Sequence, residues 1–518
     1  MADLVTLTID DVAVSVPKGT LVIEAAKQAG VLVPHYCYHP GLPVAGVCRM
    51  CLVEIEKAPK LQIACATQVA EGMVVRTGSE QAKSGRTGVL EMLLINHPLD
   101  CPICDQAGEC ELQDFTFQEG RPSTRYSPTY PKRFNPVEDF GPDVLYVPNR
   151  CILCTRCVRF MEDVAQEPVL NVSERGDRAF IGIHPDAQLD HPWAGNVVDL
   201  CPVGSLLSKD FLHKARAWEL DKTASVCTGC SQGCNVTLDL RDDTVVRIRP
   251  RANLEVNRYF ICDHGRGAYR WMNRGDRVEA PLVREGDDLR AVDWDEALDR
   301  VRALLKGAGG SAVTLVSPRA STEALYFARK LLARFTWTGA FQVVMGEEAA
   351  LAGVPNLALR AERAPNGKGA ELLGYSRDYA AALRAAEKAA VVLVIDDPEA
   401  QVKTAGQVIY LGTAVPGSLK ADIILPMASM VEEDGTYVNR DGRVQRYFQA
   451  RGTPAMARPA WWVLGQLADA APESAAAAFD LLAAEVDAFR SMSYATLGLT
   501  GQRSGAGAGA GAGAGVPA

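Results

Sequence analysis

The stretch RCILCTRCVRF at residues 150–160 carries the most specific pattern in the sequence, with Cys151, Cys154 and Cys157 at C-x2-C-x2-C spacing. Cys201 follows at a distance and stands directly before a proline. Three closely spaced thiolates with a remote Cys-Pro are typical of [4Fe–4S] loops, because cysteine sulfur holds the iron of such clusters. We assign these four cysteines to one [4Fe–4S] cluster, and a zinc site is the alternative.

A second group of cysteines lies near the N-terminus and contains Cys37, Cys48, Cys51 and Cys65. A central C-x2-C pair lets two sulfurs converge on one site, and the plant-type [2Fe–2S] pattern has this shape with a shorter first interval. Gly46, before the pair, allows the backbone to approach the cluster sulfurs closely. We predict a [2Fe–2S] cluster here, with a four-cysteine zinc site as the alternative.

The segment HPLDCPICDQAGEC at residues 97–110 has only three cysteines, Cys101, Cys104 and Cys110. A fourth ligand must come from elsewhere, and a neutral imidazole can replace a thiolate on iron. His97 precedes the first of these cysteines by four residues, so we predict a [4Fe–4S] site with one histidine ligand. The alternatives are a capping or surface histidine, or a zinc site with the same three cysteines and one histidine.

The last group contains Cys227, Cys230, Cys234 and Cys262, whose spacing also suits a [4Fe–4S] cluster. The four groups use all 15 cysteines of the chain together with one histidine. Four complete four-ligand sites without a spare cysteine are much harder to obtain by chance than any single motif. Clustered cysteines in a chain without a secretory signal indicate metal rather than a disulfide framework.

The bulk composition sets wide limits on the function. The chain has 518 residues, 48% of them hydrophobic and 23% charged, as in globular proteins of several domains, and its net charge of −9 argues against general nucleic-acid binding. No apolar stretch is long enough to span a bilayer, so membrane association is expected only through a partner. No GxGxxG follows a predicted strand and no P-loop is present, so we expect no dinucleotide site.

Periodicity divides the chain into a β-rich start and an α/β second half. Alternating apolar residues over 5–16 predict a hairpin, and 21–30 a helix with Thr20 as N-cap and Gly30 as stop. Residues 83–96 predict a helix with Val89, Met92, Leu93 and Leu94 on its apolar face. A further helix is expected over 151–165, and 117–148 is expected to be irregular. Four segments from 311 onward predict a mostly parallel sheet with helices: strands at 311–317, 391–396 and 408–413, and a helix at 321–335.

Taken together, the motifs resemble one protein family. YCYHPGLPVAGVCRMCLVEIE at 36–56, NHPLDCPICDQAGECELQD at 96–114, RCILCTRCVRF and DLCPVGSLLSKDFLHKARAWEL at 199–220 look like the large iron–sulfur subunits of NADH–quinone oxidoreductase (respiratory complex I), called the G subunits in bacteria. The resemblance covers residues 1–275. It implies a [2Fe–2S] cluster at the first site, [4Fe–4S] clusters at the other three, and His97 as a true ligand; the fourth site occurs only in some bacterial members.

Residues 220–500 are similar to the molybdopterin oxidoreductase fold, for example in LPMASMVEEDGTYVNRDGRVQR at 425–446. The resemblance implies a relic domain without molybdenum, shorter here than in the family. No cysteine follows Cys262 to bind the metal, and CDHG at 262–265 lacks the lysine that active enzymes place after the fourth cysteine. We therefore expect no molybdenum cofactor.

The expected fold class is multi-domain, α+β and α/β. In order along the chain we expect a β-grasp [2Fe–2S] ferredoxin-type domain, a [4Fe–4S] segment with one histidine and three cysteine ligands, a [4Fe–4S] ferredoxin-like domain, a [4Fe–4S] module of molybdopterin oxidoreductase type, a degenerate molybdopterin oxidoreductase-like domain, and a disordered Gly/Ala tail. The boundaries are 1–80, 81–120, 121–219, 220–276, 277–500 and 501–518.

The resemblance implies an electron relay without a substrate-converting site of its own. Electrons would arrive from the flavin subunit that oxidises NADH, enter at the [2Fe–2S] site, pass to the Cys151 site and then the His97 site, and leave through a two-cluster ferredoxin-like subunit toward quinone. The chain would sit in the peripheral arm at the cytoplasmic side of the bacterial inner membrane. The rival interpretations are a molybdenum-dependent formate dehydrogenase or hydrogenase subunit, and a zinc-stabilised scaffold.

Overall fold

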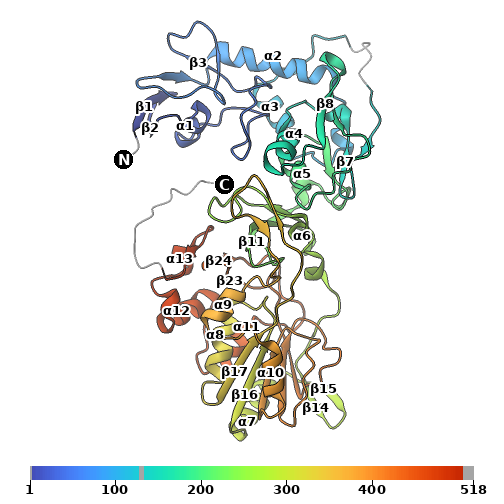
Figure 1. Ribbon diagram of the computed structural model, residues 1–518, viewed down its shortest axis with the longest axis vertical. Helices are drawn as coiled ribbons and strands as arrows, with labels where there is room; N and C mark the ends of the chain where they lie inside the picture. The colour runs from blue at the N-terminus through green and yellow to red at the C-terminus, as the bar shows by residue number, and fades with distance from the viewer. Residues whose placement is uncertain (1–2, 128–133, 506–518) are drawn as a thin grey trace. The chain divides into compact units, whose positions relative to one another are not determined.

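The computed structural model describes residues 3–127 and 134–505, and the chain divides into two compact units. The first unit is Met1–Leu220 with the short segment Leu351–Asn356, and the second is Asp221–Ala350 with Leu357–Ala518. Figure 1 colours residues 1–220 from blue to green and the later residues from green to red. Within the described ranges, no helix is both long and apolar enough to cross a membrane. The tail predicted to be disordered over 501–518 lies outside the described residues from 506 onward, but its start was wrongly assigned, because Gln502–Arg503 form strand β25 and pair with residues 443–444.

A five-stranded sheet opens the first unit. Its strands are β1 (Leu4–Ile9), β2 (Val12–Pro17), β3 (Leu52–Ile55), β4 (Gln62–Ile63) and β5 (Val74–Arg76), in the order β2-β1-β5-β3-β4. β1 and β2 form the predicted antiparallel hairpin. Asp10 and Asp11 turn the chain with φ of 44° and 68°, a left-handed conformation that Asp tolerates.

Helix α1 (Val22–Gln28) confirms the predicted helix but not its predicted cap. Leu21 occupies the N-cap position without a side-chain hydrogen bond, whereas the Thr20 hydroxyl donates to the carbonyl of Pro17. Thr20 therefore closes the preceding turn and does not cap the helix. Gly30 ends the segment as predicted, since its φ of 76° leaves the helical region.

Helix α2 (Glu80–Asn96) starts three residues before its predicted beginning because the Ser79 hydroxyl accepts a hydrogen bond from the amide of Ala82. Val89 and Leu93 pack against an apolar core as predicted. Met92 does not, since it is 75% exposed, and Leu90 is fully buried instead. The assignment of Met92 was wrong because the core meets α2 on the Leu90 side of Val89, whereas Met92 lies on the other side of the helix.

The rest of the first unit consists of short elements joined by loops. They are η1 (Cys101–Ile103), α3 (Glu111–Glu119), β6 (Glu138–Asp139), β7 (Val144–Tyr146), η2 (Pro148–Arg150), α4 (Arg156–Arg159), η3 (Phe160–Val164), β8 (Leu170–Ser173), η4 (Gly176–Arg178), β9 (Phe180–Ile183), α5 (Asn196–Leu200), β10 (Leu206–Ser208) and η5 (Ala217–Glu219). Sheets β10-β7-β6 and β8-β9 organise them. The predicted helix over 151–165 forms only from Arg156, as α4 continued by the π-helical turn η3, and residues 151–155 are loop. The segment 117–148, expected to be irregular, contains β6 and β7.

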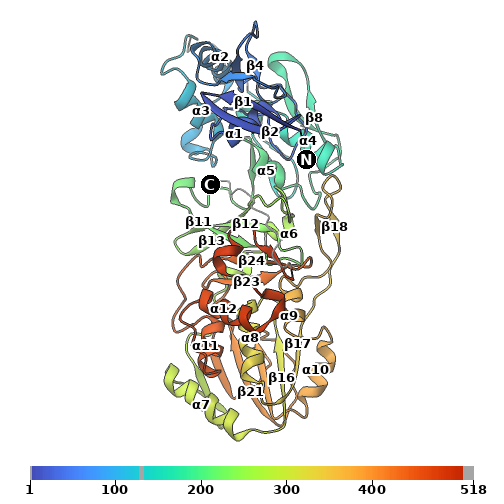
Figure 2. The same cartoon turned by 90° about the vertical axis from the view of Figure 1, so that its left-hand side faces the viewer.

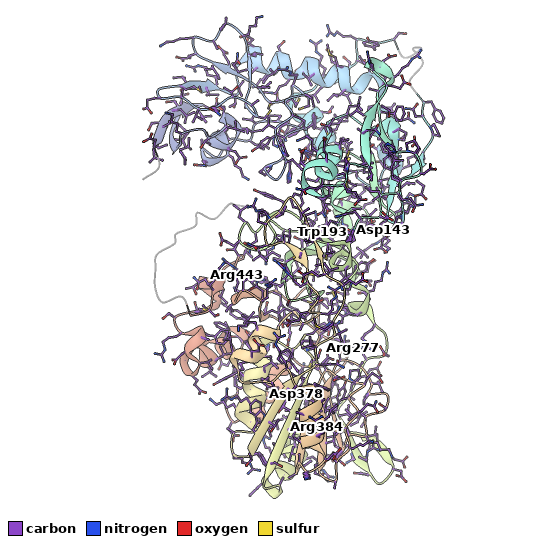
Figure 3. The ribbon with its side chains drawn as sticks, viewed as in Figure 1. Asp143, Trp193, Arg277, Asp378, Arg384 and Arg443 are labelled. Carbon is purple, nitrogen blue, oxygen red and sulfur yellow. The ribbon has the colours of Figure 1, made fainter. Side chains whose placement is uncertain are left out.

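Two features close the packing of this unit. Trp193, before α5, is fully buried and labelled in Figure 3. The segment Leu351–Asn356 lies against η3, where the Gly353 amide donates to the Val164 carbonyl at 2.7 Å. A Cβ at Gly353 would stand 2.5 Å from the Asp163 carbonyl oxygen, so this close approach requires glycine.

The second unit begins with a small antiparallel sheet, β11 (Asp221–Val226), β12 (Asn235–Arg241) and β13 (Thr244–Pro250). The short elements α6 (Asp263–Arg266) and η6 (Arg270–Asn273) follow. A second three-stranded sheet, β23 (Gly435–Val438), β24 (Arg443–Tyr447) and β25 (Gln502–Arg503), comes from the C-terminal part. The short pair β18 (Ala349–Ala350) and β19 (Ala358–Leu359) flanks the segment that belongs to the first unit.

A seven-stranded sheet forms the centre of the second unit (Figure 2). Its strands are β14 (Leu282–Glu285), β15 (Asp288–Ala291), β16 (Ser311–Val316), β17 (Thr336–Phe341), β20 (Val391–Ile395), β21 (Gln407–Gly412) and β22 (Ile423–Pro426), in the order β15-β14-β22-β21-β20-β16-β17. All pairs from β17 to β22 are parallel, and β14 and β15 add an antiparallel edge. The mostly parallel α/β sheet is thus confirmed.

Helices cover both faces of this sheet. α7 (Trp294–Gly307), α8 (Thr322–Leu331), α11 (Ala460–Leu467) and α12 (Ala475–Glu485) contribute to the larger apolar core, and α10 (Tyr379–Ala386) to the smaller one. Asp378, labelled in Figure 3, caps α10 by accepting from the Ala381 amide. The remaining elements are α9 (Gly367–Leu372), η7 (Asp487–Phe489) and α13 (Tyr494–Leu497).

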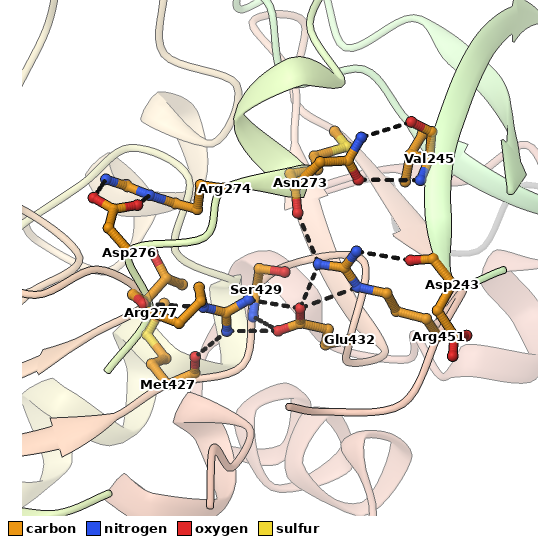
Figure 4. Close-up of polar contacts among 12 residues, drawn as sticks. Asp243, Val245, Asn273, Arg274, Asp276, Arg277, Met427, Ser429, Glu432 and Arg451 are labelled. Atoms are coloured by element: carbon orange, nitrogen blue, oxygen red, sulfur yellow. Dashed lines mark hydrogen bonds and ion pairs between the residues drawn. The ribbon is translucent and has the colours of Figure 1, made fainter. Parts of the chain in front are cut away.

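A buried ion triad links the end of the seven-stranded sheet to η6 and to the turn between β12 and β13 (Figure 4). Glu432, fully buried, accepts from Arg277 at 2.7 and 2.8 Å and from Arg451 at 2.8 Å. Arg277 also donates to the carbonyl of Met427 after β22, and Arg451 to that of Met272 in η6. Burial opposes ionisation of Glu432, but the hydrogen bonds and charge of Arg277, together with hydrogen bonds from the Ser429 amide and Arg451, outweigh it and lower its pKa.

Candidate cluster-binding sites

The four cysteines of the 150–160 motif line one cavity. Cys151, Cys154, Cys157 and Cys201 face it together with apolar and hydroxyl side chains. The other lining residues are Tyr146, Ile152, Thr155, Arg156, Ile181, Val203, Ser205 and Leu206. Four thiols around one mostly apolar cavity are the surroundings that an iron–sulfur cluster needs, so these residues fit the predicted [4Fe–4S] group.

The backbone of this motif is curled tightly. Leu153 and Thr155 both have positive φ, 54° and 57°, which is uncommon for residues with branched side chains and marks a constrained loop. The Leu153 amide donates to the Cys151 sulfur at 3.4 Å. Helix α4 then starts inside the motif at Arg156. The curl therefore turns the cysteines of the motif toward the cavity.

Burial favours the protonated form of the thiols at this site. It raises the pKa of Cys151 and Cys201 to about 11 and that of Cys154 to about 12, and neighbouring cysteines add to the shift. Cysteine binds metal as the thiolate, so loading a cluster must release protons here.

The four cysteines of the N-terminal group also come together. Cys37, Cys51 and Cys65 are buried, and the Cys37 amide donates to the Cys48 sulfur at 3.4 Å. Side-chain hydrogen bonds with Cys48 and Cys65 lower the pKa of Cys37, and those with Cys37 and Cys51 raise the pKa of Cys65. These mutual effects show that the predicted ligands contact one another.

Gly46 in this loop has φ of 66°, and a Cβ there would lie 3.1 Å from the Ile63 side chain. Arg49, between the central cysteines, also has a left-handed φ of 59°. The loop thus makes two sharp turns around the Cys48–Cys51 pair, and the close approach of the Gly46 backbone to cluster sulfurs stays a prediction.

The His97 group is the most open of the four. Cys104 and Cys110 are buried, whereas Cys101 is exposed, and His97 occupies the C-cap position of α2. Burial raises the pKa of Cys110 to about 11, with Cys104 and Cys101 adding to the shift. Gly204 packs directly on this loop, because a Cβ there would lie 2.1 Å from the Cys104 sulfur. The same loop is held by Arg216, which donates to the Cys104 carbonyl at 2.7 Å.

The fourth group lies in the second unit, between β11 and α6. Cys227, Cys230, Cys234 and Cys262 are all buried, and burial raises the pKa of Cys227 to about 12. Burial likewise raises the pKa of the remaining three thiols.

Glycine makes room at this site. A Cβ at Gly265 would lie 3.0 Å from the Cys227 sulfur and 3.4 Å from the Cys262 sulfur. The Gly229 amide donates to Cys227, and the Gly265 amide to Cys262, both at 3.3 Å. The Thr228 hydroxyl, beside Cys227, is buried without a hydrogen-bond partner among the described residues. A donor left unpaired beside four thiols fits a bound group with acceptor sulfurs.

Ligands of the first three groups share one apolar core. It contains Cys37 and Cys48 of the first group, Cys110 of the His97 group, and Cys154 and Cys201 of the 150–160 group. The other members are Tyr36, Ala45, Met50, Val89, Leu90, Leu93, Leu94, Leu112, Phe115, Ile152 and Val203. The Tyr36 hydroxyl in this core is buried and has no hydrogen-bond partner in the described chain. Sequence reasoning did not single out Tyr36, Thr228 or Gly204, because only packing reveals them.

In residues 3–127 and 134–505, no three His, Cys, Asp or Glu side chains form a ready site for a single metal ion. The four ligand sets, which sequence spacing predicts, therefore stay predictions. Arg156 and Arg159, which stand beside ligands in the sequence, donate hydrogen bonds to backbone carbonyls of ligand-bearing loops.

Family models match most of the chain, segment by segment. Residues 2–80 match a 2Fe-2S iron-sulfur cluster binding domain, 86–125 the NADH-ubiquinone oxidoreductase-G iron-sulfur binding region, and 141–207 the ferredoxin-like domain of NADH-quinone oxidoreductase subunit 3. Residues 220–274 match the molybdopterin oxidoreductase Fe4S4 domain, and 277–351 with 381–470 match molybdopterin oxidoreductase. Iron–sulfur cluster-binding domains are thus present in both units.

Curated relatives agree with these matches. The mitochondrial NADH-ubiquinone oxidoreductase 78 kDa subunit of Candida albicans is 45% identical over 299 residues, covering 58% of this chain and 41% of the relative. The G subunit of the NADH-quinone oxidoreductase of Rickettsia bellii is 40% identical over 330 residues, covering 64% of this chain and 48% of the relative.

The chain is similar to the G subunits of NADH-quinone oxidoreductase. It spans less than half of the length of these two relatives. Among solved structures, an NAD+-reducing [NiFe]-hydrogenase in the H2-reduced state is similar at 32% identity and a TM-score of 0.37, covering 41% of this chain and 90% of the hydrogenase chain.

Proposed function

We propose that this chain is the iron–sulfur electron-relay subunit of an NADH–quinone oxidoreductase, passing electrons from a flavin-containing, NADH-oxidising subunit toward quinone. The observation that carries the proposal is the shared apolar core of the first unit, which holds ligands of three predicted sites. A relay needs its redox centres embedded in one protein body, since single electrons pass only over short distances. The relationship to the G subunits supports the same role.

The finer assignment keeps the ligand sets predicted from the sequence. One [2Fe–2S] cluster would be held by Cys37, Cys48, Cys51 and Cys65, and three [4Fe–4S] clusters by the other sets. Those sets are His97, Cys101, Cys104 and Cys110; Cys151, Cys154, Cys157 and Cys201; and Cys227, Cys230, Cys234 and Cys262. When bound, such clusters accept and release single electrons at potentials that the protein tunes. The cavity lined by Cys151 supports the third of these sets, and the glycines beside Cys227 support the fourth.

The chain's own residues supply three things that a relay requires. Mostly buried thiols provide the ligands, one apolar core packs against ligands of three of the sites, and constrained loops hold the cysteines in place. Water exclusion and hydrogen bonds to sulfur are the levers by which proteins set cluster potentials.

The domain plan belongs to the same proposal. It comprises the β-grasp [2Fe–2S] domain, the segment with one histidine and three cysteine ligands, the ferredoxin-like domain, the molybdopterin-type [4Fe–4S] module and the degenerate molybdopterin-like domain, with no molybdenum bound. The matched segments support this order. The proposed partners are the flavin subunit, a two-cluster ferredoxin-like subunit and other peripheral-arm subunits, at the cytoplasmic face of a bacterial inner membrane.

Metal analysis of the anoxically purified chain tests the proposal. We expect about fourteen iron atoms with matching acid-labile sulfide, from one binuclear and three four-iron clusters, and no molybdenum. Low-temperature EPR of the reduced sample should resolve distinct cluster signals, and His97→Ala should disturb one of them. Zinc in place of iron would refute the relay and leave a scaffold. Stoichiometric molybdenum would instead make the chain a catalytic subunit.

A further inference from the structure

The guanidinium of Arg156 lies where ligand-bearing segments of the first unit meet. Its Nη2 donates to the carbonyl of Tyr38 at 2.8 Å, and its Nη1 donates to the carbonyl of Leu200 at 3.2 Å. Tyr38 follows the predicted ligand Cys37, and Leu200 precedes the predicted ligand Cys201. One side chain of the 150–160 motif therefore holds the backbone of the N-terminal cysteine group and of the remote cysteine.

Glu111, which belongs to the segment of the His97 site, is the partner of Arg156. Its two carboxylate oxygens accept from Arg156 at 3.1 and 3.2 Å, and it follows the predicted ligand Cys110 directly. The Glu111 amide in turn donates to the carbonyl of Pro202, at 3.0 Å. The Arg156–Glu111 pair thus touches segments from all three predicted sites of the first unit.

The chemistry of this position calls for arginine. The Arg156 side chain is only 4% exposed, and a buried charge is tolerated only when it is paired and well hydrogen-bonded. A planar guanidinium can offer five donors in a fixed fork, whereas the lysine ammonium is a point charge on a flexible stem. Only the fork can reach two carbonyls and both oxygens of one carboxylate at once.

We propose that Arg156, paired with Glu111, is a positioning residue that holds the ligand loops of the first three sites in one fixed arrangement. The inference rests on the proposed relay function. The contacted backbone at Tyr38 and Leu200 belongs to no strand, so no sheet ladder sets the spacing between these segments. Hydrogen bonds from one buried side chain to several carbonyls take over that role.

Arg156→Lys tests the proposal, because lysine keeps the positive charge and loses the fork. We expect the holo-protein to keep its iron, while the EPR signals and midpoint potentials of all three first-unit clusters change together. The fourth cluster should keep its wild-type signal. Each signal is assigned beforehand by substituting one predicted ligand of each site.

Arg86→Lys is the matched control. Arg86 is 2% exposed, pairs with Glu119 at 3.1 Å, and donates to the carbonyls of Leu52 and Thr77. It has the same kind of partners as Arg156, but only Leu52 adjoins a predicted ligand. Its substitution should therefore alter the [2Fe–2S] signal at most. A general effect of losing a buried arginine would instead appear equally in both variants and would count against the proposal.

Wild-type signals from all three clusters in an iron-replete Arg156→Lys protein would overturn the proposal, as would a change confined to one cluster. If the Arg156→Lys protein fails to assemble the three clusters, the same EPR measurement on Glu111→Gln decides whether the pair has a positioning role. It keeps the side-chain shape and an acceptor oxygen but removes the charge that the guanidinium faces. Joint changes in three signals would support the positioning role, and three unchanged signals would exclude it. If the proposed relay function is wrong, the metal analysis of the wild-type protein shows it first, because that protein then contains no iron.

Discussion

The two units support their cysteine groups in different ways. In the first unit, ligands from three predicted sites pack into one apolar core, and the Arg156–Glu111 pair touches segments of all three. In the second unit, the Cys227 group stands by itself between β11 and α6, with Gly229 and Gly265 making room beside its sulfurs. A disturbance in the first unit should therefore reach several sites, whereas one in the second should stay at one site.

The largest expected effect comes from breaking the ion triad of the second unit. Glu432→Gln would leave Arg277 and Arg451 without their shared carboxylate, which costs about 3–5 kcal/mol for a buried pair. Chemical denaturation followed by a probe in each unit should show earlier unfolding of the second unit and an unchanged first unit. Glu285→Gln, in the exposed pair with Arg290, is the control and should cost at most about 1 kcal/mol. An equal loss of unfolding free energy in both units would show that the two units do not unfold independently.

Two glycine substitutions compare the sites directly. Gly204→Ala would place a Cβ 2.1 Å from the Cys104 sulfur, and Gly265→Ala one 3.0 Å from the Cys227 sulfur. Overpacking of this kind lowers the free energy of unfolding by roughly 1–3 kcal/mol, and by more where the neighbouring atoms cannot move. Iron content and EPR should show Gly204→Ala altering more than one first-unit cluster, and Gly265→Ala only the fourth. A single affected cluster in Gly204→Ala would contradict the shared-core interpretation.

A pH effect on stability is expected in the second unit. Burial raises the pKa of Glu323 to about 7, although Thr436 and Tyr494 donate hydrogen bonds to it. Its usual value is 4.5, so between about 4.5 and 7 the folded state binds a proton that the unfolded state has lost. The free energy of unfolding should fall as pH rises through this window, by up to about 1.4 kcal/mol per pH unit.

Glu323→Gln should remove that part of the pH dependence, measured as the difference between variant and wild-type unfolding curves. The neighbouring Glu433 is also buried, and the charge of Glu323 adds to the rise in its pKa, so the difference reports Glu323 together with its effect on Glu433. Parallel curves for the two proteins would show that Glu323 does not titrate in this range.

The smallest effects compare two serine caps, one in each unit. Ser79 accepts from the Ala82 amide at the start of α2, and Ser321 from the Ala324 amide at the start of α8. Replacing either by alanine should cost about 1 kcal/mol in its own unit. Because α2 contributes Leu90 to the shared core, Ser79→Ala should also broaden first-unit cluster signals, whereas Ser321→Ala should leave the fourth signal unchanged. If both substitutions change the cluster signals of their own unit equally, the first unit does not transmit a helix disturbance to its clusters more strongly than the second.

Local patterns predicted the elements well where one physical cause dominated. The hairpin of β1 and β2 and the buried strands β16, β20 and β21 followed from alternation and apolar runs. Thr20 was assigned as a cap although its hydroxyl serves the preceding turn, and Met92 was placed in a core that α2 meets with Leu90. Both errors concern which neighbour a side chain meets, and periodicity does not contain that information.

The sequence by itself determined the cysteine groups, their order and the change from cluster-binding segments to an α/β half, because ligand spacing and hydrophobic periodicity are local properties. Only the tertiary structure decided that three groups share one core and that Arg156 joins their loops. It also showed that Gly204 lies against Cys104, although these residues are far apart in the chain. Such contacts depend on how distant segments pack together, and packing is a property of the whole fold.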